Sequence, residues 1–383
     1  MSVILPGATI GILGGGQLGR MTGMAARSLG YDVQVLDPDP DCPARAIASR
    51  TITARFDDAD AAAELARDCD VVTLEIEQIA RPALEAVTTL TPLRPRAEAV
   101  FTVQDRIRQR SWLDKHGFPV GPYRAVGTAD ECAAAVTALG PSICKAPMGG
   151  YDGRGQRRVR TAEEGTEAWK ALGSGRVIVE QFLDLDIELS VLVARREDGV
   201  CAVYPPSVNH HVHGVLDWAI TPGALQAPLL QHAQQVARAI AESMGIVGLL
   251  AVELFLTKDG RLLVNELAPR PHNTYHHSER GHSTSQFEQL VRAVCGLPLG
   301  SVDAVAPAAI ANLLGDLWVE GDQPHFVEAL AVPDVRLHLY GKASARPGRK
   351  MGHLSAIAAT AEEALARVLE ARRRMATRSA IEV

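Results

Sequence analysis

The sequence predicts a multidomain α/β protein that starts with a parallel sheet. Predicted strands alternate with predicted helices over residues 8–89, a glycine-rich turn follows the first strand, and a β-hairpin is predicted over 251–273. We therefore divide the chain into a parallel-sheet domain over 1–103, a smaller α/β unit over 104–185 and a C-terminal α+β domain over 186–383. A small terminal subdomain is expected from about residue 301.

The composition is typical of a soluble globular protein with an ample core, because 47% of the 383 residues are hydrophobic and 22% are charged. The net charge of −6 disfavours nucleic acid as a partner, and no apolar run reaches the roughly 18 residues of a membrane span. The N-terminal stretch has no basic segment and is typical of a first strand rather than a signal peptide. Six scattered cysteines without a CxxC pair predict free thiols in a reducing cytoplasm.

In the first domain, a strand over 8–13 leads into the glycine motif Gly14-Gly15-Gly16-Gln17-Leu18-Gly19 and a helix to about residue 29. The further elements expected are a strand at 32–37, a helix at 59–69, a strand at 70–75 and helices at 82–89 and 104–117. The motif, with Asp37 ending the next strand, satisfies the dinucleotide-binding fingerprint. Helix N-termini also bind other phosphates. Three interpretations follow: an NAD(P) site, a site for another phosphorylated ligand, and a purely structural turn.

The second unit is expected to hold a strand at 123–126, a helix at 129–139, a strand at 142–145 and a strand at 176–180. A segment with four glycines, 148–156, follows Lys145 at a strand end. Glycine lets backbone N–H groups approach a phosphate closely, and Lys145 can reach the same phosphate. We interpret the segment as a functional lid, the alternative being a mobile surface loop. The strand end Val177–Leu183 suits adenine and ribose recognition, or is an ordinary strand end with solvated acids.

The third domain contains the hairpin, a strand at 188–195, helices at 227–244, 284–295 and 361–376, and a strand at 336–340. If Asp259-Gly260 is a two-residue turn, Glu253 lies directly opposite Glu266, whereas a three-residue loop would break this pairing. Carboxylates about 5 Å apart repel by roughly 3 kcal/mol at an effective dielectric near 20. Mg²⁺, an ion pair with a neighbour such as Arg270, or solvation of the sheet face would each relieve the repulsion.

Two other groups of residues have weaker signals. His210, His211 and His213 lack a partner at zinc-ligand spacing, so we do not expect a structural metal there. His276 and His277 are expected to be loop residues. The basic turn Arg346–Lys350 is interpreted either as solvated or as an anion site.

Several motifs in combination resemble one family. They are GGGQLGRM near the N-terminus, GGYDGRGQ after a lysine, VEQFL, AVELF, NELAPRPHN, TSQFEQ and RPGRKMGHL. Together they resemble the ATP-grasp superfamily and, within it, the ligases that carboxylate aminoimidazole ribonucleotide in purine biosynthesis. The resemblance covers nearly the whole chain and implies an ATP-grasp fold: an N-terminal Rossmann-like pre-ATP-grasp domain, a small lid domain and a C-terminal α+β domain. It also implies a cytoplasmic homodimer.

The resemblance implies roles for individual residues. The residues expected to hold ATP are Arg106, Lys145, Gly150, Tyr151, Asp152, Gly153, Arg154, Gly155, Gln156, Glu180, Gln181, Phe182, Leu183, Glu188, His211, Asn265 and Glu266. Mg²⁺ would be bound by Glu253 and Glu266. The residues expected to bind the ribonucleotide are Gly16, Gln17, Leu18, Glu75, Glu77, Tyr151, Arg154, Asn273, Lys342 and Arg349. Asp152 and His272, with Lys145 and Arg154, would lie at the carboxylation chemistry.

The implied reaction transfers the γ-phosphoryl group of ATP to bicarbonate, and the resulting carboxyphosphate carboxylates the substrate amine. The chain departs from the family pattern at Thr274-Tyr275, where Ser-Gly is usual, and at Ala146-Pro147 after the lid lysine. The competing hypotheses are a formate-using ATP-grasp transformylase, an NAD(P) oxidoreductase and a non-catalytic nucleotide sensor.

Overall fold

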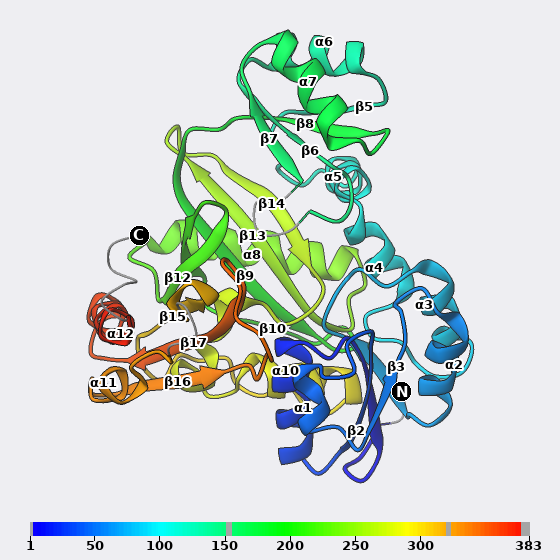
Figure 1. The fold of residues 1–383 in the computed structure, drawn as a ribbon, viewed down its shortest axis with the longest axis vertical. Coiled ribbons are helices and arrows are strands. Elements are labelled where there is room, and N and C mark those ends of the chain that lie inside the picture. Colours follow the sequence, from blue (N-terminus) through cyan, green and yellow to red (C-terminus); the bar gives the residue numbers. More distant parts are fainter. Residues whose placement is uncertain (1–2, 151–154, 319–322, 377–383) are drawn as a thin grey trace.

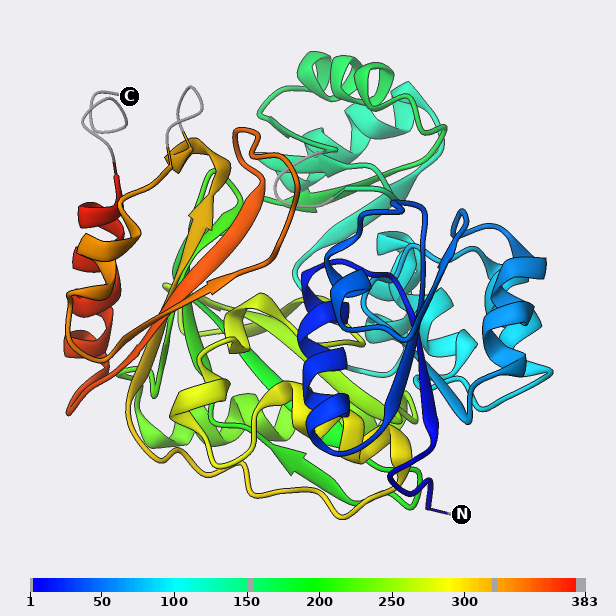
Figure 2. The same ribbon diagram turned by 60° about the horizontal axis from the view of Figure 1, so that its bottom comes forward.

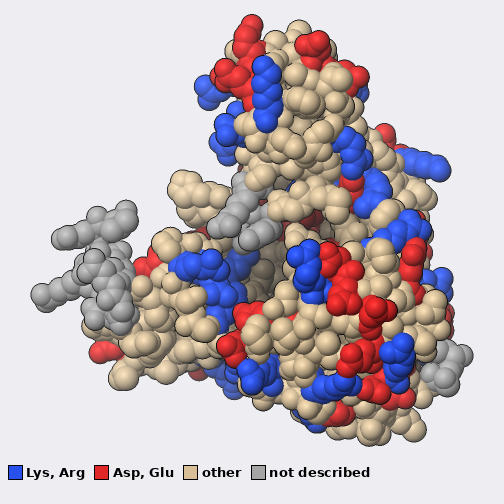
Figure 3. Space-filling view, turned by 45° about the vertical axis from the view of Figure 1, so that its right-hand side comes forward, with Lys and Arg blue, Asp and Glu red and all other residues tan. Residues whose placement is uncertain are grey.

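Three β-sheets organise the chain (Figure 1). The computed structural model describes residues 3–150, 155–318 and 323–376. In Figure 2 the small sheet unit lies above the place where the N-terminal and C-terminal parts meet. Figure 3 shows a hollow in the surface where these three parts approach one another, bordered by charged side chains of both signs. The expected α/β architecture is confirmed, with a parallel sheet at the N-terminus and antiparallel sheets elsewhere.

The N-terminal sheet is parallel, with the strand order β3-β2-β1-β4. Its strands are β1 (Thr9–Leu13), β2 (Asp32–Asp37), β3 (Arg50–Thr53) and β4 (Val71–Leu74). The helical segments around it are α1 (Gln17–Ser28), η1 (Pro43–Ala46), α2 (Ala59–Arg67), α3 (Arg81–Thr88) and α4 (Ala97–Gln104). Strands β1 and β4 are buried on both faces, which is why they read as apolar runs in the sequence, whereas β3, at one edge of the sheet, is partly exposed.

The helix predicted over 104–117 is confirmed as α5 (Arg106–Lys115), which begins two residues later than expected. Helix α4, which was not predicted, ends at Gln104, and the single residue Asp105 separates it from α5. Asp105 has an extended backbone, and its carboxylate accepts hydrogen bonds from the N–H groups of Ile107 and Arg108. An aspartate in this position is a strong N-cap, so it starts a new helix rather than continuing the old one.

The small unit, which we call the lid unit, is a four-stranded antiparallel sheet with two helices packed on it. The elements are β5 (Tyr123–Val126), α6 (Ala129–Leu139), β6 (Ser142–Lys145), β7 (Gln156–Val159), α7 (Ala162–Leu172) and β8 (Val177–Gln181). Strands β6 and β7 are paired with Lys145 opposite Gln156. The glycine-rich segment therefore connects two neighbouring strands of a hairpin, of which β7 was not predicted.

The C-terminal part is built on one nine-stranded sheet. The strands are β9 (Leu185–Arg195), β10 (Cys201–Val203), β11 (Ser207–Val212), β12 (Val215–Thr221), β13 (Gly248–Thr257), β14 (Leu262–Ala268), β15 (Ala308–Leu314), β16 (Val335–Leu339) and β17 (Lys350–Ile357). The helical segments are α8 (Ala227–Ser243), η2 (Asn273–Tyr275), α9 (Ser278–Gly281), α10 (Gln286–Cys295), η3 (Gly315–Leu317), α11 (Phe326–Leu330) and α12 (Ala361–Met375). Because β12 pairs with β15, the strands after residue 301 extend the same sheet.

Helices α8 and α10 cover opposite faces of β9 and β13. Val191 and Val193 pack with α8, whereas Leu192 and Ala194 pack with α10 and the N-terminal sheet. This alternation follows from the two-residue period of a strand. It joins the N-terminal domain to the central strands through one continuous core, so the glycine turn after β1 is held at a fixed distance from the hairpin.

The turn of the central hairpin differs from the two-residue prediction. The loop is Lys258-Asp259-Gly260, closed by hydrogen bonds between Thr257 and Arg261, and Gly260 has a φ of +83°. A glycine in the left-handed region is typical of a three-residue hairpin loop. This loop alone would break the Glu253–Glu266 pairing. A β-bulge inserts Asn265 between the residues paired with Glu253 and Leu254 and restores the register, so Glu253 lies directly opposite Glu266.

All six cysteines are free thiols, and five of them are buried. No helix in the described part of the chain is both long and apolar enough to cross a bilayer.

Candidate active site

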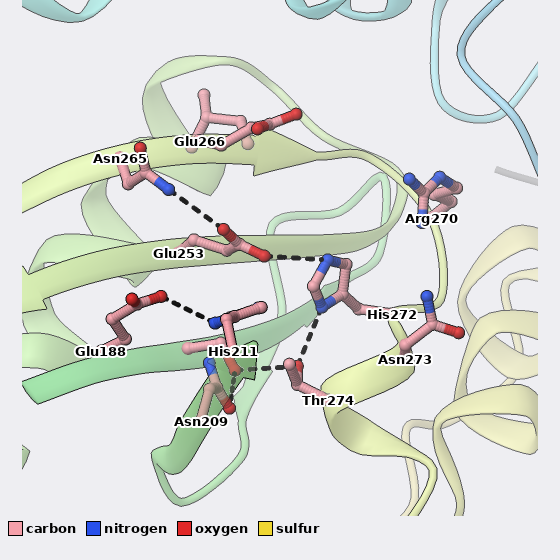
Figure 4. A network of polar contacts seen from close by, with 12 residues as sticks. Glu188, Asn209, His211, Glu253, Asn265, Glu266, Arg270, His272, Asn273 and Thr274 are labelled. Carbon is pink, nitrogen blue, oxygen red and sulfur yellow. Dashed lines mark hydrogen bonds and ion pairs between the residues drawn. The ribbon is translucent and has the colours of Figure 1, made fainter. Parts of the chain in front are cut away.

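Glu253 and Glu266 form the centre of the site. They are directly opposed on β13 and β14, and both side chains reach the same face of the sheet (Figure 4). Asn265, the bulge residue, donates from Nδ2 to Oε2 of Glu253 at 3.1 Å. Burial, and then the charge of Glu266, raise the pKa of Glu253. Burial also acts to raise the pKa of Glu266, but Arg106 lowers it. A cation bound nearby would therefore stabilise the ionised form of both carboxylates.

The cation that contacts Glu266 in this structure is Arg106, not Arg270. Arg106, in the first turn of α5, places Nη1 3.0 Å from Oε2 of Glu266 and donates from Nη2 to the Gly150 carbonyl at 3.0 Å. Arg270 pairs instead with Glu77, with Nε 2.8 Å from Oε1. The ion-pair alternative that named Arg270 is thus wrong about the partner. Glu253 has no Arg or Lys partner among the described side chains, although His272 lies beside it.

His272 is held between Glu253 and Thr274 (Figure 4). Its Nε2 lies 3.3 Å from Oε1 of Glu253, and its Nδ1 lies 2.8 Å from the Thr274 hydroxyl. The hydroxyl of Ser190, on β9, donates to the same threonine at 2.8 Å. Burial, followed by the positive charge of Arg270, holds the pKa of His272 well below its usual value. The imidazole is therefore neutral near pH 7.

A second acid–histidine pair lies on the next strands. Oε2 of Glu188 on β9 is 2.7 Å from Nδ1 of His211 on β11 (Figure 4). Burial acts to lower the pKa of His211, but Glu188 and Glu253 raise it overall. The expected nucleotide residues Glu188 and His211 thus lie close to the carboxylate pair. His210 does not join them, since it stacks on Trp218 with ring centroids 4.9 Å apart.

Lys145 lies at the end of β6 and pairs with Glu180 of β8. Arg110 of α5 contacts the same carboxylate and donates to the Val264 carbonyl at 2.6 Å. Burial acts to raise the pKa of Glu180, but the two cations lower it to about 2. Glu180 is therefore ionised and holds Lys145 in place at the base of the lid unit. Arg110 was not predicted. The sequence did contain a signal for it, because Arg110 lies four residues after Arg106, and this spacing puts both side chains on one face of a helix.

The strand end expected to hold the adenine is partly exposed. Phe182 is 44% exposed, and its backbone N–H donates to the Pro141 carbonyl at 2.8 Å. Gln181 donates from its side chain to the Leu139 carbonyl at 3.0 Å, while Leu183 is half-buried. From the lid segment, Gly155 accepts a hydrogen bond from the Ala146 N–H. Tyr151, Asp152, Gly153 and Arg154 lie outside the described residues.

The glycine turn after β1 is filled by carboxylates of the chain itself. Glu75, which follows β4, accepts hydrogen bonds from the N–H groups of Gly16 at 2.5 Å and Gly19 at 2.6 Å. Asp37 accepts one from Gly15 at 2.6 Å. Burial raises the pKa of Glu75. The amides that a dinucleotide fingerprint would aim at a pyrophosphate are bonded to these two acids, which counts against the NAD(P) interpretation.

Gln17, at the start of α1, bridges two distant segments. Its Nε2 donates to Oδ1 of Asn273 at 2.8 Å, and its Oε1 accepts from Nζ of Lys342 at 2.9 Å. Lys342 also donates to the Lys350 carbonyl at 2.6 Å. Three of the expected ribonucleotide residues are therefore in direct contact. Arg349 is not, because it donates to the carbonyl and hydroxyl of Ser344 at 2.8 and 3.0 Å. Leu18 is buried against Phe287 and Tyr340.

Comparison with protein families covers most of the chain. Residues 7–104 match the ribonucleotide synthetase preATP-grasp domain, residues 111–287 match the ATP-grasp domain, and residues 308–367 match the phosphoribosylaminoimidazole carboxylase C-terminal domain. Among curated relatives, the N5-carboxyaminoimidazole ribonucleotide synthase of Bacillus subtilis is 40% identical over 92% of both chains. That of Brucella melitensis is 39% identical over 92% of this chain and 97% of its own.

Solved structures agree with these relatives. An ADP complex of an N5-carboxyaminoimidazole ribonucleotide synthetase superposes with a TM-score of 0.90 at 37% identity, covering 97% of both chains. The N5-carboxyaminoimidazole synthase of Aspergillus clavatus, in complex with ADP and 5-aminoimidazole ribonucleotide, has a TM-score of 0.87 at 31% identity. That match covers 96% of this chain and 98% of the other.

Proposed function

This chain belongs to the N5-carboxyaminoimidazole ribonucleotide synthase family of ATP-grasp ligases, and we propose which of its residues perform the family's reaction. The enzyme uses ATP to carboxylate 5-aminoimidazole ribonucleotide in purine biosynthesis. The observation that supports the location of the chemistry is the pair Glu253 and Glu266, directly opposed beside His272 and Arg106. We place the phosphoryl transfer at this pair.

We propose that ATP lies between the lid unit and the nine-stranded sheet. Lys145 and Arg106 supply positive charge to its phosphates, and the strand end Glu180–Leu183 faces the adenosine. The fit of Mg²⁺ rests on the donor set: two carboxylates on adjacent strands, where burial and then the charge of Glu266 raise the pKa of Glu253. Mg²⁺ bound there would neutralise charge on the transferring phosphoryl group. Arg106 would then shift from Glu266 toward the phosphates.

The ribonucleotide is proposed to bind on the opposite side of His272, between α1 and the loop that joins β16 to β17. Support comes from the contacts of Gln17 with Asn273 and Lys342, which bring three segments to one place. Lys342 and Arg349 would bind the phosphate of the ribonucleotide, since both are basic and lie on one loop. Glu75 and Glu77 would face its hydroxyl and amino groups.

The proposed chemistry starts with attack of a bicarbonate oxygen on the γ-phosphorus of ATP, which releases ADP and forms carboxyphosphate. The exocyclic amine of the ribonucleotide then forms a C–N bond with the carboxyl carbon, and phosphate leaves. The amine must lose a proton in this step. The departing phosphate can take up this proton, and neutral His272, whose Nε2 faces Glu253 and whose Nδ1 contacts Thr274, borders the place where this step occurs. A closed site keeps water away from the labile intermediate.

The test is ADP release measured with and without the ribonucleotide while bicarbonate is varied. We expect release to depend on both substrates. Glu253→Gln and Glu266→Gln should each lower kcat by at least about 100-fold, because a neutral amide binds Mg²⁺ weakly. Glu328→Gln, a charge-matched change at a side chain that is 55% exposed, is the control. Activity near that of the unmodified enzyme in either hairpin variant would refute the metal assignment, and release driven by formate would favour a transformylase.

We further propose that 1–103, 104–185 and 186–383 are the structural units of the chain, that the lid unit is the one that moves during catalysis, and that the protein is a cytoplasmic homodimer. The free thiols of all six cysteines support a reducing compartment. Sedimentation at micromolar concentration tests the oligomeric state.

A further inference from the structure

A second cluster of histidines and an acid lies away from the carboxylate pair. His338 on β16 and His353 on β17 are directly opposed in the strand register, and their rings stack with centroids 4.4 Å apart and planes 10° apart. Glu279, in the short helix α9, places Oε2 3.6 Å from Nδ1 of His338. In the part of the chain that the structure describes, this is the one group of three such side chains whose ligand atoms lie within 4.8 Å of one another.

Several polar atoms of this cluster lack hydrogen-bond partners. These atoms are Nε2 of His338, Nε2 of His353 and Oε2 of Glu279. His353 is fully buried, so a ring nitrogen without a partner there is unfavourable. Its Nδ1 lies 2.9 Å from the buried hydroxyl of Tyr340. If Nδ1–H donates to that hydroxyl, the lone pair of Nε2 is left to bind a ligand. A metal-bound histidine is commonly oriented in this way.

We propose that Glu279, His338 and His353 bind one divalent transition-metal ion, for which Zn²⁺ is the best chemical match. Two imidazoles and one carboxylate form a borderline-soft donor set, suited to Zn²⁺ rather than to Mg²⁺ or Ca²⁺. With bonds of about 2.1 Å, tetrahedral ligand atoms lie roughly 3.4 Å apart, so shifts of about an ångström would complete the site. A water molecule would occupy the fourth position.

The surroundings allow an ion to enter. Glu279, His338 and Tyr340 line a cavity of about 430 Å³ whose opposite wall is helix α1. Burial lowers the pKa of His338 and of His353, so neither imidazole has to lose a proton before it binds a metal. Arg336 and Arg280 lie close enough to lower the pKa of His338, and they reduce the affinity for a cation. His276 stacks on His353 with centroids 4.4 Å apart. It was expected in a loop, yet it is fully buried.

The position of this cluster suggests what the ion would do. Strands β16 and β17 are joined by the loop that carries Lys342 and Arg349. An ion bound to one residue from each strand and one from α9 would cross-link the base of that loop. Metal binding should therefore raise the melting temperature. It should also lower the KM for the ribonucleotide more than the KM for ATP. This second expectation rests on the proposed function, whereas the change in melting temperature does not.

The first experiment is a titration of metal-free full-length protein with Zn²⁺ by calorimetry. We expect one equivalent to bind with a Kd of about 1 μM or tighter. His338→Gln and Glu279→Gln should each weaken binding by roughly 100-fold. Both side chains are about a quarter exposed, so both substitutions should be tolerated. His325→Gln is the matched control, since His325 also lies near a glutamate, Glu328, at the surface, and it should bind like the unmodified protein.

Other zinc-binding groups of the chain need a separate control. Glu253→Gln should keep the same affinity; loss of binding in that variant would place the ion in the catalytic site and overturn the proposal. Binding weaker than 100 μM, or binding unchanged in His338→Gln and Glu279→Gln, would overturn it as well. If these variants do not fold, Co²⁺ absorption of the unmodified protein decides. Strong visible bands of a tetrahedral nitrogen–oxygen site support the proposal, and their absence refutes it.

Discussion

Replacing Glu180 by glutamine is expected to destabilise the protein by about 3 kcal/mol at pH 7. Lys145 and Arg110 overcome the effect of burial and lower the pKa of Glu180 from 4.5 to about 2. A tenfold change in proton affinity corresponds to about 1.4 kcal/mol, so ionisation of this carboxyl contributes about 3 kcal/mol. The side chain is 13% exposed, and solvent screens the interaction little. Glutamine would leave two cations facing a neutral amide, which adds to the loss.

The sign of the pH dependence follows from the lowered pKa. A carboxyl whose pKa is lower in the folded state stabilises the protein above its unfolded pKa, and this stabilisation is lost as the pH falls through the folded pKa. The difference between the unmodified protein and Glu180→Gln should therefore be constant above about pH 5. It should fall to less than half by about pH 3 and vanish near pH 1–2.

The assay is urea unfolding followed by circular dichroism, repeated between pH 7 and pH 3, with the KM for ATP measured at pH 7. Glu167→Gln, an exposed change on helix α7 of the same unit, is the control and should leave stability within about 0.5 kcal/mol. We expect the KM for ATP to rise in Glu180→Gln, because Lys145 loses the group that holds it. Equal stability of the two variants, or a difference that does not shrink toward pH 3, would refute this reasoning.

Three further predictions concern the substrate sites. Arg349→Ala should raise the KM for the ribonucleotide at least about tenfold and change the KM for ATP much less. Steady-state kinetics with each substrate varied in turn measures both values, and an equal change in the two KM values would contradict the prediction. Thr274→Val should lower kcat about 5- to 10-fold, because the His272 ring loses the hydroxyl group at Nδ1. Thr274→Ser keeps that hydroxyl and should retain activity. Similar rates in both variants would exclude the orienting role of Thr274. NADH should show no calorimetric binding at 100 μM, because Asp37 and Glu75 accept the hydrogen bonds of the glycine turn; micromolar affinity would revive the oxidoreductase interpretation.

Much of the fold was predictable because its signals are local. The alternation of strands and helices, the lysine before the glycine-rich segment and the hairpin at 251–273 depend on patterns within about ten residues. Helix α4 and the N-cap at Asp105 were missed, although the N-cap signal is local too. The motifs after Lys145 and around Glu266 indicated an ATP-grasp enzyme by resemblance, and the family comparisons confirm that family.

The sequence by itself determined which residue types meet at the site, since the carboxylates, lysine and histidine stand in motifs that local backbone geometry keeps together. Only the tertiary structure decided their partners. Glu253 faces Glu266 because a bulge at Asn265 offsets the three-residue loop. Each of these two features shifts the strand register by one residue, and no turn rule predicts that the two shifts cancel. Arg106, 160 residues away, pairs with Glu266 in place of nearby Arg270. Such pairing depends on how separate elements pack, because the interaction energy of two charges depends on their distance in space and not on their separation along the chain.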